Sequence, residues 1–312
     1  MINSKLMPKQ EQIDTEAALA EAIQEKNQKN HSMKRRRAIS NTITYILLVF
    51  LCIIWILPIA AVFMVSIRNE SGTATSLIPT TGYTWDNYIN LLTSETYPFL
   101  KWFTNTLIVA VFVMLISTIF VFSVAYTMSR LRFKGRKGLM NINLILGMFP
   151  GFMSMIAVYN ILKAIGISGS LIALILIYSA ASGSGFYIAK GFFDTISKSL
   201  DEAARIDGAN NFKVFYKIIL PLSKPIIVYT LLTSFMGPWV DYIYSSVILR
   251  AETDNYTVAL GLYNMINSID TYQLNYTMFF AGSVMISIPI MILFLLTQKY
   301  YVAGVTGGSV KG

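Results

Sequence analysis

Long runs of apolar residues with almost no charge constrain this chain more than any other feature of its sequence. Each run is close to the length of roughly 20 residues that a helix needs to cross a bilayer. Charged residues make up only 13% of the chain, about half the share typical of soluble domains. The sequence therefore predicts an all-α, polytopic membrane protein with six transmembrane helices. The six runs lie at about 43–66, 102–127, 139–161, 170–190, 226–248 and 277–298.

Lysine and arginine are unevenly distributed over the segments that join these runs. One set of alternate segments carries 21 of the 25, and the other set carries four. Short loops rich in these residues stay in the cytoplasm, so both termini are predicted to be cytoplasmic. The net charge of +9 is then a topology signal, and no nucleic-acid partner is expected. The basic set comprises 1–42, 128–138, 190–225 and 299–312.

Residues 1–42 form a polar extension before the first run. The stretch TEAALAEAIQEKNQ within it is compatible with a helix that has Thr15 as its N-cap. A basic run from Lys34 to Arg37 follows, and we interpret it as an orientation anchor. His31, the only histidine, is not expected to be a ligand or a catalyst, and Cys52, the only cysteine, excludes a disulfide framework.

Between the fourth and fifth runs lies a charged segment, SLDEAARIDGANNFKVFYKIILPLSKP. Ser199 and Glu202 have the spacing of a capping box, which marks the start of a helix. Gly208 is suited to the left-handed conformation that ends one. Asn210 or Asn211 can cap a second short helix. The sequence therefore predicts two short helices joined by a tight turn.

The same segment combines small, charged and apolar side chains. Ala203 and Ala204 are short enough for another surface to approach closely, and Glu202 and Asp207 offer charges at its edge. Taken alone, these residues fit either a packed elbow of the chain itself or a docking surface for a separate protein. An apolar stripe at helical spacing follows, made of Phe212, Phe215, Tyr216 and Ile219.

This segment resembles the EAA signature of binding-protein-dependent ABC importer permeases of the sugar branch. In that family the corresponding loop, here 193–224, sits in a cleft on the ATP-hydrolysing subunit. The resemblance thus implies an ATPase-coupling role for the matching residues and for Asp207. Other similar segments are SLIPTTGYTWDNY, AYTMSRLRFKGR, MFPGFMSMIAVYNIL and WVDYIYSSVIL. The residues that match the signature are Glu202, Ala203, Ala204, Gly208, Leu220 and Pro221.

The ending QKYYVAGVTGGSVKG resembles the C-terminal tail of maltose-type permease subunits. In those relatives the tail, here 299–312, reaches the interface between the two ATPase subunits. The same role is implied for Gln298, Gly307, Gly308 and Lys311.

The resemblance implies a type I ABC importer permease in a bacterial inner (cytoplasmic) membrane. Its cargo would be a sugar, of maltose or maltodextrin type, delivered by an external binding protein. The segment 249–276 is either a contact for that protein, as the resemblance implies, or an ordinary surface loop. Other implied partners are a second permease subunit and two ATP-binding subunits. The chain has no G-x-x-x-x-G-K-[ST] motif, so we expect no cofactor in it and Mg-ATP on the partners. Glycerol-phosphate and other oligosaccharide permeases share much of this pattern, which leaves the cargo open.

A sugar path needs polar groups beside aromatic faces, and the fifth run offers both. Asp241 is the only acid in the six runs. A carboxylate near the bilayer centre costs about 2.5–3.5 kcal/mol on insertion scales, so it should face a cavity or pair with the companion subunit. Together with Thr230, Ser234, Gly237 and Tyr244 it is predicted to lie on one face of a helix. The candidate path residues are Thr230, Ser234, Trp239, Asp241, Tyr242 and Tyr244.

Two other classes of membrane protein fit this sequence less well. An ion-coupled secondary transporter usually has several ionisable residues at the midplane, whereas here Asp241 stands alone. A membrane enzyme needs acid–base or metal-binding groups, and the runs contain no histidine and no second acid. We therefore predict a non-catalytic subunit without a metal site. Prolines at 58, 150, 238 and 289 are predicted to mark kinks, and SAASGSG is predicted to allow close helix packing.

Overall fold

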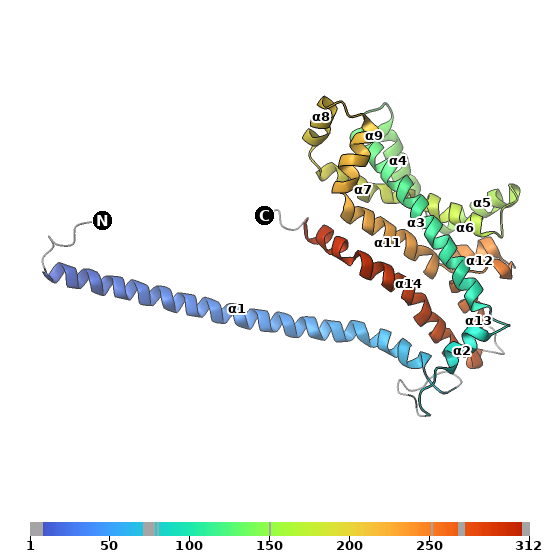
Figure 1. Cartoon of the computed structure of the whole chain (residues 1–312), viewed down its shortest axis with the longest axis horizontal. Helices are drawn as coiled ribbons and strands as arrows, with labels where there is room; N and C mark the ends of the chain where they lie inside the picture. Colours follow the sequence, from blue (N-terminus) through green and yellow to red (C-terminus); the bar gives the residue numbers. More distant parts are fainter. Residues whose placement is uncertain are drawn as a thin grey trace. The chain divides into compact units, whose positions relative to one another are not determined.

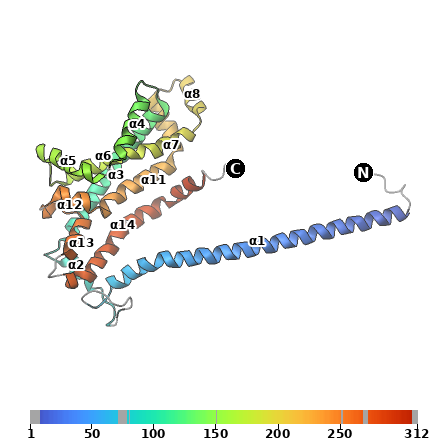
Figure 2. The ribbon, with the colours of Figure 1, turned by 180° about the vertical axis from the view of Figure 1, so that it is seen from behind.

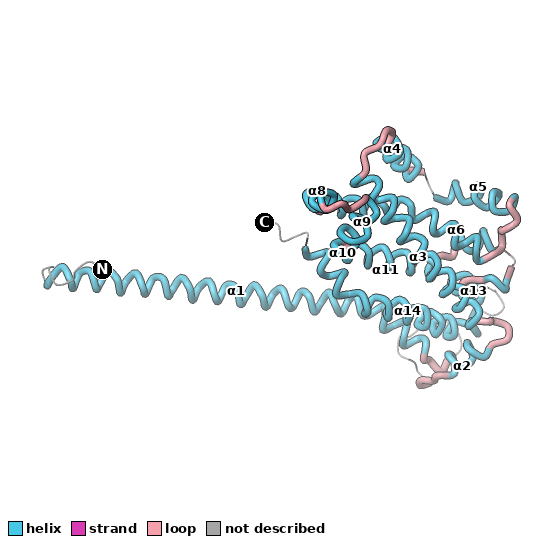
Figure 3. Tube along the Cα trace, turned by 45° about the horizontal axis from the view of Figure 1, so that its top comes forward, coloured by secondary structure: helices cyan, strands magenta, loops and turns pink. Residues whose placement is uncertain are grey.

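The computed structural model describes residues 9–70, 79, 81–149, 151–250, 252–267 and 272–307. Within these residues the chain is helical and has no strand, as Figure 3 shows by colour. One isolated bridge joins Arg68 to Tyr83. The predicted all-α class is confirmed for this part of the chain, which forms two compact units, Met1–Ala61 and Val62–Gly312.

The first unit is one helix, the greater part of α1 (Lys9–Ser66). Thr15 lies inside it, so the predicted N-cap at that residue is wrong. The apolar portion, Arg37–Ser66, is long enough to cross a membrane. From Ile39 to Ile59 its large apolar side chains are exposed all round, Trp55 among them, as expected of a helix surrounded by lipid. The first predicted span is confirmed in length and composition.

Three long helices form the middle of the second unit (Figure 1): α3 (Phe99–Arg130), α11 (Lys224–Val240) and α14 (Tyr272–Gly307). α11 packs against both of the others. α3 and α14 are each long and apolar enough to cross a membrane, in agreement with the second and sixth predicted spans. The last helix continues to Gly307, beyond the predicted end of that span at 298.

The third predicted span is not a single helix. The structure has α4 (Arg136–Gly147) and α5 (Gly151–Ala164) in its place. The sequence between them contains Pro150, whose missing N–H disfavours a continuous helix. The prediction of one helix over 139–161 is therefore wrong.

The fourth and fifth predicted spans are also interrupted. α6 (Leu171–Ala181) and α7 (Phe186–Thr195) are joined by the 3-10 turn η1 (Ser182–Gly185), with a bend of 41°. α11 ends at Val240, before the short α12 (Ile243–Leu249). The described residues contain three helices that could each cross a membrane, or up to five spans if each bent pair counts as one. Six were predicted.

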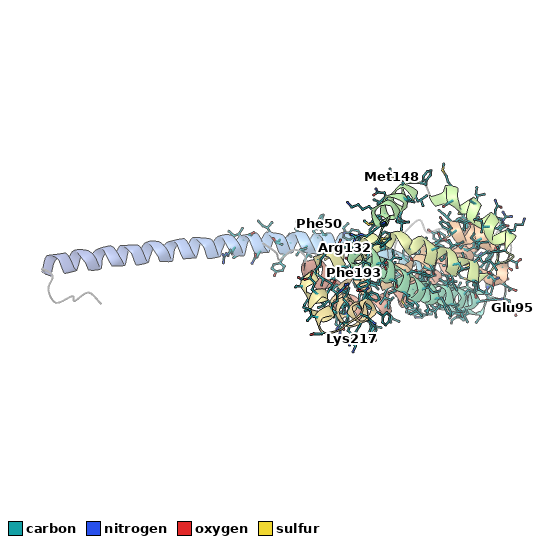
Figure 4. The ribbon with its side chains drawn as sticks, turned by 90° about the horizontal axis from the view of Figure 1, so that it is seen from above. Phe50, Glu95, Arg132, Met148, Phe193 and Lys217 are labelled. Atoms are coloured by element: carbon teal, nitrogen blue, oxygen red, sulfur yellow. The ribbon has the colours of Figure 1, made fainter. Side chains whose placement is uncertain are left out.

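Short helices gather at the two ends of the second unit, as Figures 1 and 2 show from opposite sides. α8 (Lys198–Ile206) and α9 (Asn211–Val214) lie at one end, beside α4. α2 (Asp86–Thr93) and α13 (Val258–Asn267) lie at the other. In Figure 4, Arg132 and Lys217 mark the first end and Glu95 the second.

Tight packing joins the long helices near α13. Trp102 of α3 is buried against Gly261 of α13, where an added Cβ would overlap its ring. Trp239 of α11 lies in the same cluster, in edge contact with Phe103 at 5.0 Å between ring centroids. The packing fixes the end of α11 at which the helix breaks.

Candidate functional site

The segment 198–222 forms an elbow, which we call the coupling elbow, with α8 as its first arm. α8 ends in a left-handed residue, Gly208, at φ 81°. The N–H of Gly208 donates to the carbonyl of Arg205 at 3.0 Å, and the N–H of Ala209 donates to that of Ala204 at 2.8 Å. These two bonds define a Schellman motif. The predicted turn at Gly208 is confirmed.

The start of α8 differs from the prediction. Ser197 is the N-cap, and its hydroxyl accepts from the N–H of Ser199 at 3.4 Å. Ser199 lies inside the helix, so the predicted capping box between Ser199 and Glu202 is wrong. Two serines separated by one residue offer two caps, and the earlier one adds residues to the helix.

The second arm begins at Asn210, whose side-chain oxygen accepts from the N–H of Lys213 at 2.9 Å. After α9 come a π-helical turn, η2 (Phe215–Ile219), and α10 (Leu220–Leu222). Pro221 has no N–H for the Lys217 carbonyl, and its ring would crowd that carbonyl in a regular α-helix. The wider turn relieves this crowding.

The predicted coupling residues lie together on the elbow. Ala204 and Leu220 are half-buried, and the others are exposed. The most exposed of the large apolar side chains is one that the sequence reasoning missed, Ile206, at 87%. The apolar stripe predicted after Asn211 is partly exposed and partly buried. Phe212 (73%) and Tyr216 are exposed with parallel rings, whereas Ile219 is buried in the core.

A buried ion pair holds the elbow to α3. Arg130, at the end of α3, lies 3.1 Å from the carboxylate of Asp201 in α8, and both side chains are at least nine-tenths buried. The guanidinium also donates to the carbonyls of Phe193 and Ile196, at 3.0 and 2.8 Å. Sequence reasoning used Arg130 only as a topology charge and did not find this contact. Its partner is remote in sequence, so no local pattern marks it.

A second tie lies beside the first. The hydroxyl of Tyr126 in α3 donates to the carbonyl of Asn211 at 2.9 Å, and Arg205 donates to the Asn211 side chain at 2.9 Å. Val214 and Ile219 are fully buried in the same cluster as Phe122 and Phe193. The elbow is thus an exposed projection on a firmly packed base.

A cavity of about 290 Å³ lies between α3, the bent α6–α7 pair and α11. Of the candidate path residues, Thr230 and Ser234 line it, beside Ser117 and Tyr178. Thr230 also donates to its own helix, to the carbonyl of Ile226 at 3.0 Å. The other candidate residues are not among those that line the cavity.

Asp241 lies at a break rather than on a helix face, because α11 ends one residue before it. Its carboxylate accepts from the hydroxyl of Tyr178 at 2.6 Å and from the N–H of Ser245 at 3.0 Å. It therefore caps α12 and joins α11 to α6. The prediction that Asp241 and Tyr244 continue the helix face of Thr230 is wrong.

Three aromatic candidates lie apart from the cavity. Trp239 is fully buried against Phe235 and Phe103. Tyr244 donates to the carbonyl of Gly151 at 3.1 Å. Tyr242 packs against the ring of Tyr263 at 3.9 Å between centroids.

Of the predicted C-terminal contacts, Gln298 is exposed on α14 and Gly307 is the last residue of that helix. Gly308 and Lys311 lie outside the described residues.

The model of a protein family, the binding-protein-dependent transport system inner membrane component, matches residues 122–306. The chain belongs to this family. The permease is 38% identical over 283 residues to the galactooligosaccharides transport system permease protein GanQ of Bacillus subtilis (strain 168), covering 90% of this chain and 99% of that protein. It is 35% identical over 287 residues to the maltodextrin transport system permease protein MalD of Streptococcus pneumoniae (strain ATCC BAA-255 / R6), covering 91% and 100%.

The permease also has the fold of a solved bacterial ABC transporter chain involved in the import of the acidic polysaccharide alginate. The TM-score is 0.65 at 24% identity, covering 84% of this chain and 96% of that one. The relatives are transport permease proteins, so the permease is a non-catalytic transport component, as predicted.

Proposed function

We propose that the permease is the transmembrane subunit of an ATP-driven ABC importer for an oligosaccharide. It works with a second permease subunit, two ATP-binding subunits and an external sugar-binding protein, in a bacterial cell membrane with both termini in the cytoplasm. The observation that carries this proposal is the coupling elbow, which exposes Ile206 and Phe212 on a packed base.

The elbow has the features of a docking surface. Exposed apolar side chains lie next to Glu202 and Asp207, which are exposed too, and such a mixture is typical of the centre and rim of an interface. The Arg130–Asp201 pair would make the elbow move with α3 rather than bend away from it. The elbow thus suits the transmission of motion from an ATPase to the membrane helices.

The path for the sugar is proposed to include the cavity lined by Thr230 and Ser234. These hydroxyls and the ring of Tyr178 provide the polar groups and the aromatic face that a sugar requires. α11 joins this cavity to the elbow through a bend of 83°, so a displaced elbow would change the walls of the cavity. Alternating access would follow from rigid-body movement of α11 and its neighbours.

The cargo is proposed to be a neutral oligosaccharide of the maltodextrin or galactooligosaccharide type, because two relatives carry these names. Ion coupling finds no support, since Asp241 is already held by Tyr178 and Ser245 and is not placed as a proton relay.

Reconstitution in proteoliposomes tests the function. The complete set of subunits should import radiolabelled maltotriose or galactotriose only with ATP inside and the binding protein outside. Uptake that follows a proton or sodium gradient without the ATPase subunits would overturn the proposal. A Glu202→Lys variant should insert normally and lose ATP-driven uptake. A Lys213→Glu change, a reversed charge on the elbow outside the signature, is the matched control.

A further inference from the structure

A second cavity, of about 740 Å³, lies at the base of the coupling elbow, between the end of α3, the loop that follows it and α8. Its charge is unbalanced, because only two acids, Asp201 and Glu202, are among the lining residues. Five basic residues line it: Arg130, Arg132, Arg136, Lys198 and Arg205. The excess of positive charge suits an anion.

Arg130 supplies the sharpest evidence for a missing partner. Its side chain is 1% exposed. Nη2 donates to the carbonyls of Phe193 and Ile196, whereas Nε lies 3.1 Å from Asp201 Oδ2 in an ion pair that is not aligned as a hydrogen bond. The third nitrogen, Nη1, is buried without a hydrogen-bond partner among the described residues. Such a donor is unfavourable unless an acceptor reaches it. Asp201 Oδ1 is buried and unpartnered in the same way. The cavity thus offers a donor to an anion and an acceptor to a hydroxyl.

The cavity lies where an apolar helix meets a basic loop. α3 is a candidate span that ends at Arg130, and Arg132 follows with the exposed ring of Phe133 beside it. α4 comes next and has no buried residue, with Ile142 and Leu146 among its exposed apolar side chains. An arrangement of this kind is expected at the level of lipid headgroups, with aromatic and basic residues at the interface and apolar ones below.

We propose that this cavity binds the headgroup of an anionic phospholipid that carries a free hydroxyl, as phosphatidylglycerol does. The phosphate accepts from Arg130 Nη1 and is attracted by Arg132 and Arg136. Arg136 is already oriented, because its guanidinium donates to the Leu131 carbonyl at 3.2 Å. The headgroup hydroxyl donates to Asp201 Oδ1. A lipid held here supports the ion pair on which the elbow stands.

Positive charge on this loop also serves topology, but topology alone treats every cation of the loop alike. The cavity, in contrast, is lined by only some of these cations. Lys134 and Lys137 are exposed and are not among its lining residues, whereas Arg132 and Arg136 are. The two pairs have equal charge, and each has one residue in the loop after α3 and one in the first turn of α4, so they form a matched test.

The experiment measures, by native mass spectrometry, the lipid that binds to the purified, assembled transporter. The transporter is first delipidated. Dioleoyl phosphatidylglycerol is titrated, with dioleoyl phosphatidylcholine as the zwitterionic reference. Each lost arginine should weaken phosphatidylglycerol binding about fivefold, so the Arg132→Gln/Arg136→Gln variant should lose roughly twenty-five-fold. The Lys134→Gln/Lys137→Gln variant should stay within about twofold. Arg132→Lys/Arg136→Lys should restore most of the binding.

Three outcomes would overturn the inference. Equal losses in the arginine and lysine pairs would show diffuse surface attraction. Displacement of the lipid by millimolar inorganic phosphate would assign the cavity to a soluble anion. Lipid binding that is seen on the permease subunits alone but is absent from the assembled transporter would assign the cavity to an acidic segment of the ATPase subunits. Since lipid binding is measured without transport, failure of the proposed import function leaves this result unaffected.

Discussion

α11 is interrupted at both ends, and the two interruptions are built differently. At its start the chain turns by 83° into the coupling elbow, which leaves Ile206 and Phe212 uncovered. At its end the chain breaks at Asp241, where the carboxylate is fully engaged by Tyr178 and the start of α12. The elbow leaves apolar side chains exposed for a partner to cover, whereas the carboxylate at the Asp241 break has its hydrogen-bond partners within the chain. One end is suited to receive force and the other to resist it.

The two ends are joined by a helix of 17 residues, roughly 25 Å long at 1.5 Å per residue. Trp239 is buried near its end and Ile226 near its start, so the helix is packed at both places. A displacement at the elbow would therefore reach the Asp241 break rather than be absorbed between them. The changes below test this contrast, from the largest expected effect to the smallest.

Gly208→Pro should have the largest effect. Proline cannot adopt the φ of 81° seen at this position, and it removes the N–H that donates to Arg205. We expect ATP-driven uptake to fall by about tenfold or more, with normal protein levels in the membrane. Gly191→Ala is the control, because an added Cβ there meets nothing within 4 Å. Normal uptake by the proline variant would show that the shape of the elbow does not matter.

Arg130→Met should come next, because it leaves the buried Asp201 carboxylate without its cation. Loss of one member of a buried ion pair costs about 3–5 kcal/mol, which should appear as a lower Tm of the purified protein in detergent. The double variant Arg130→Met/Asp201→Leu should recover part of this loss. Recovery will be incomplete, since the bonds from Arg130 to Phe193 and Ile196 are also gone. Additive losses in the double variant would mean that the two residues do not support each other.

Phe212→Ala tests whether the exposed apolar surface of the elbow binds the ATPase subunits. The side chain is mostly exposed, so its loss should change the stability of the isolated chain by less than about 0.5 kcal/mol. Association with the ATPase subunits should weaken about tenfold, because an exposed aromatic is a typical anchor of an interface. Pull-down of the ATPase subunits from detergent extracts measures the effect. Tyr83→Ala, an exposed aromatic at the other end of the second unit, is the control. Equal binding by the two variants would remove Phe212 from the interface.

The same contrast explains what could be predicted from sequence. The turn at Gly208 and the cap at Asn210 depend on the conformational preferences of single residues, so local sequence was sufficient for both. The apolar lengths of α3 and α14 are likewise set by composition. The cap at Ser197 was missed because Ser199 offers the same chemistry two residues later.

The features that were missed depend on distant contacts. The apolar pattern continues through residue 241 at helical spacing, so sequence predicted one helix. At the break, Asp241 accepts from the hydroxyl of Tyr178, which is far away in the chain, and Trp239 packs against Phe103 of α3. Arg130 and Asp201 are also remote from each other in sequence, and each alone is an ordinary charge in a loop region. Only packing reveals that they form the base of the elbow.

Asp241→Asn should have the smallest effect and thereby separates the two ends of α11. Asparagine keeps the size of the side chain and can still accept from Tyr178 and Ser245, but the bonds lose their charge assistance. We expect a loss of about 1 kcal/mol in stability, measured as a small fall in Tm, with ATPase association unchanged. Tyr178→Phe should give a similar fall, and the double variant should add little to either. A loss of uptake far beyond the change in stability would instead place Asp241 in the transport path, and the Asp241 break would then resemble the elbow in function.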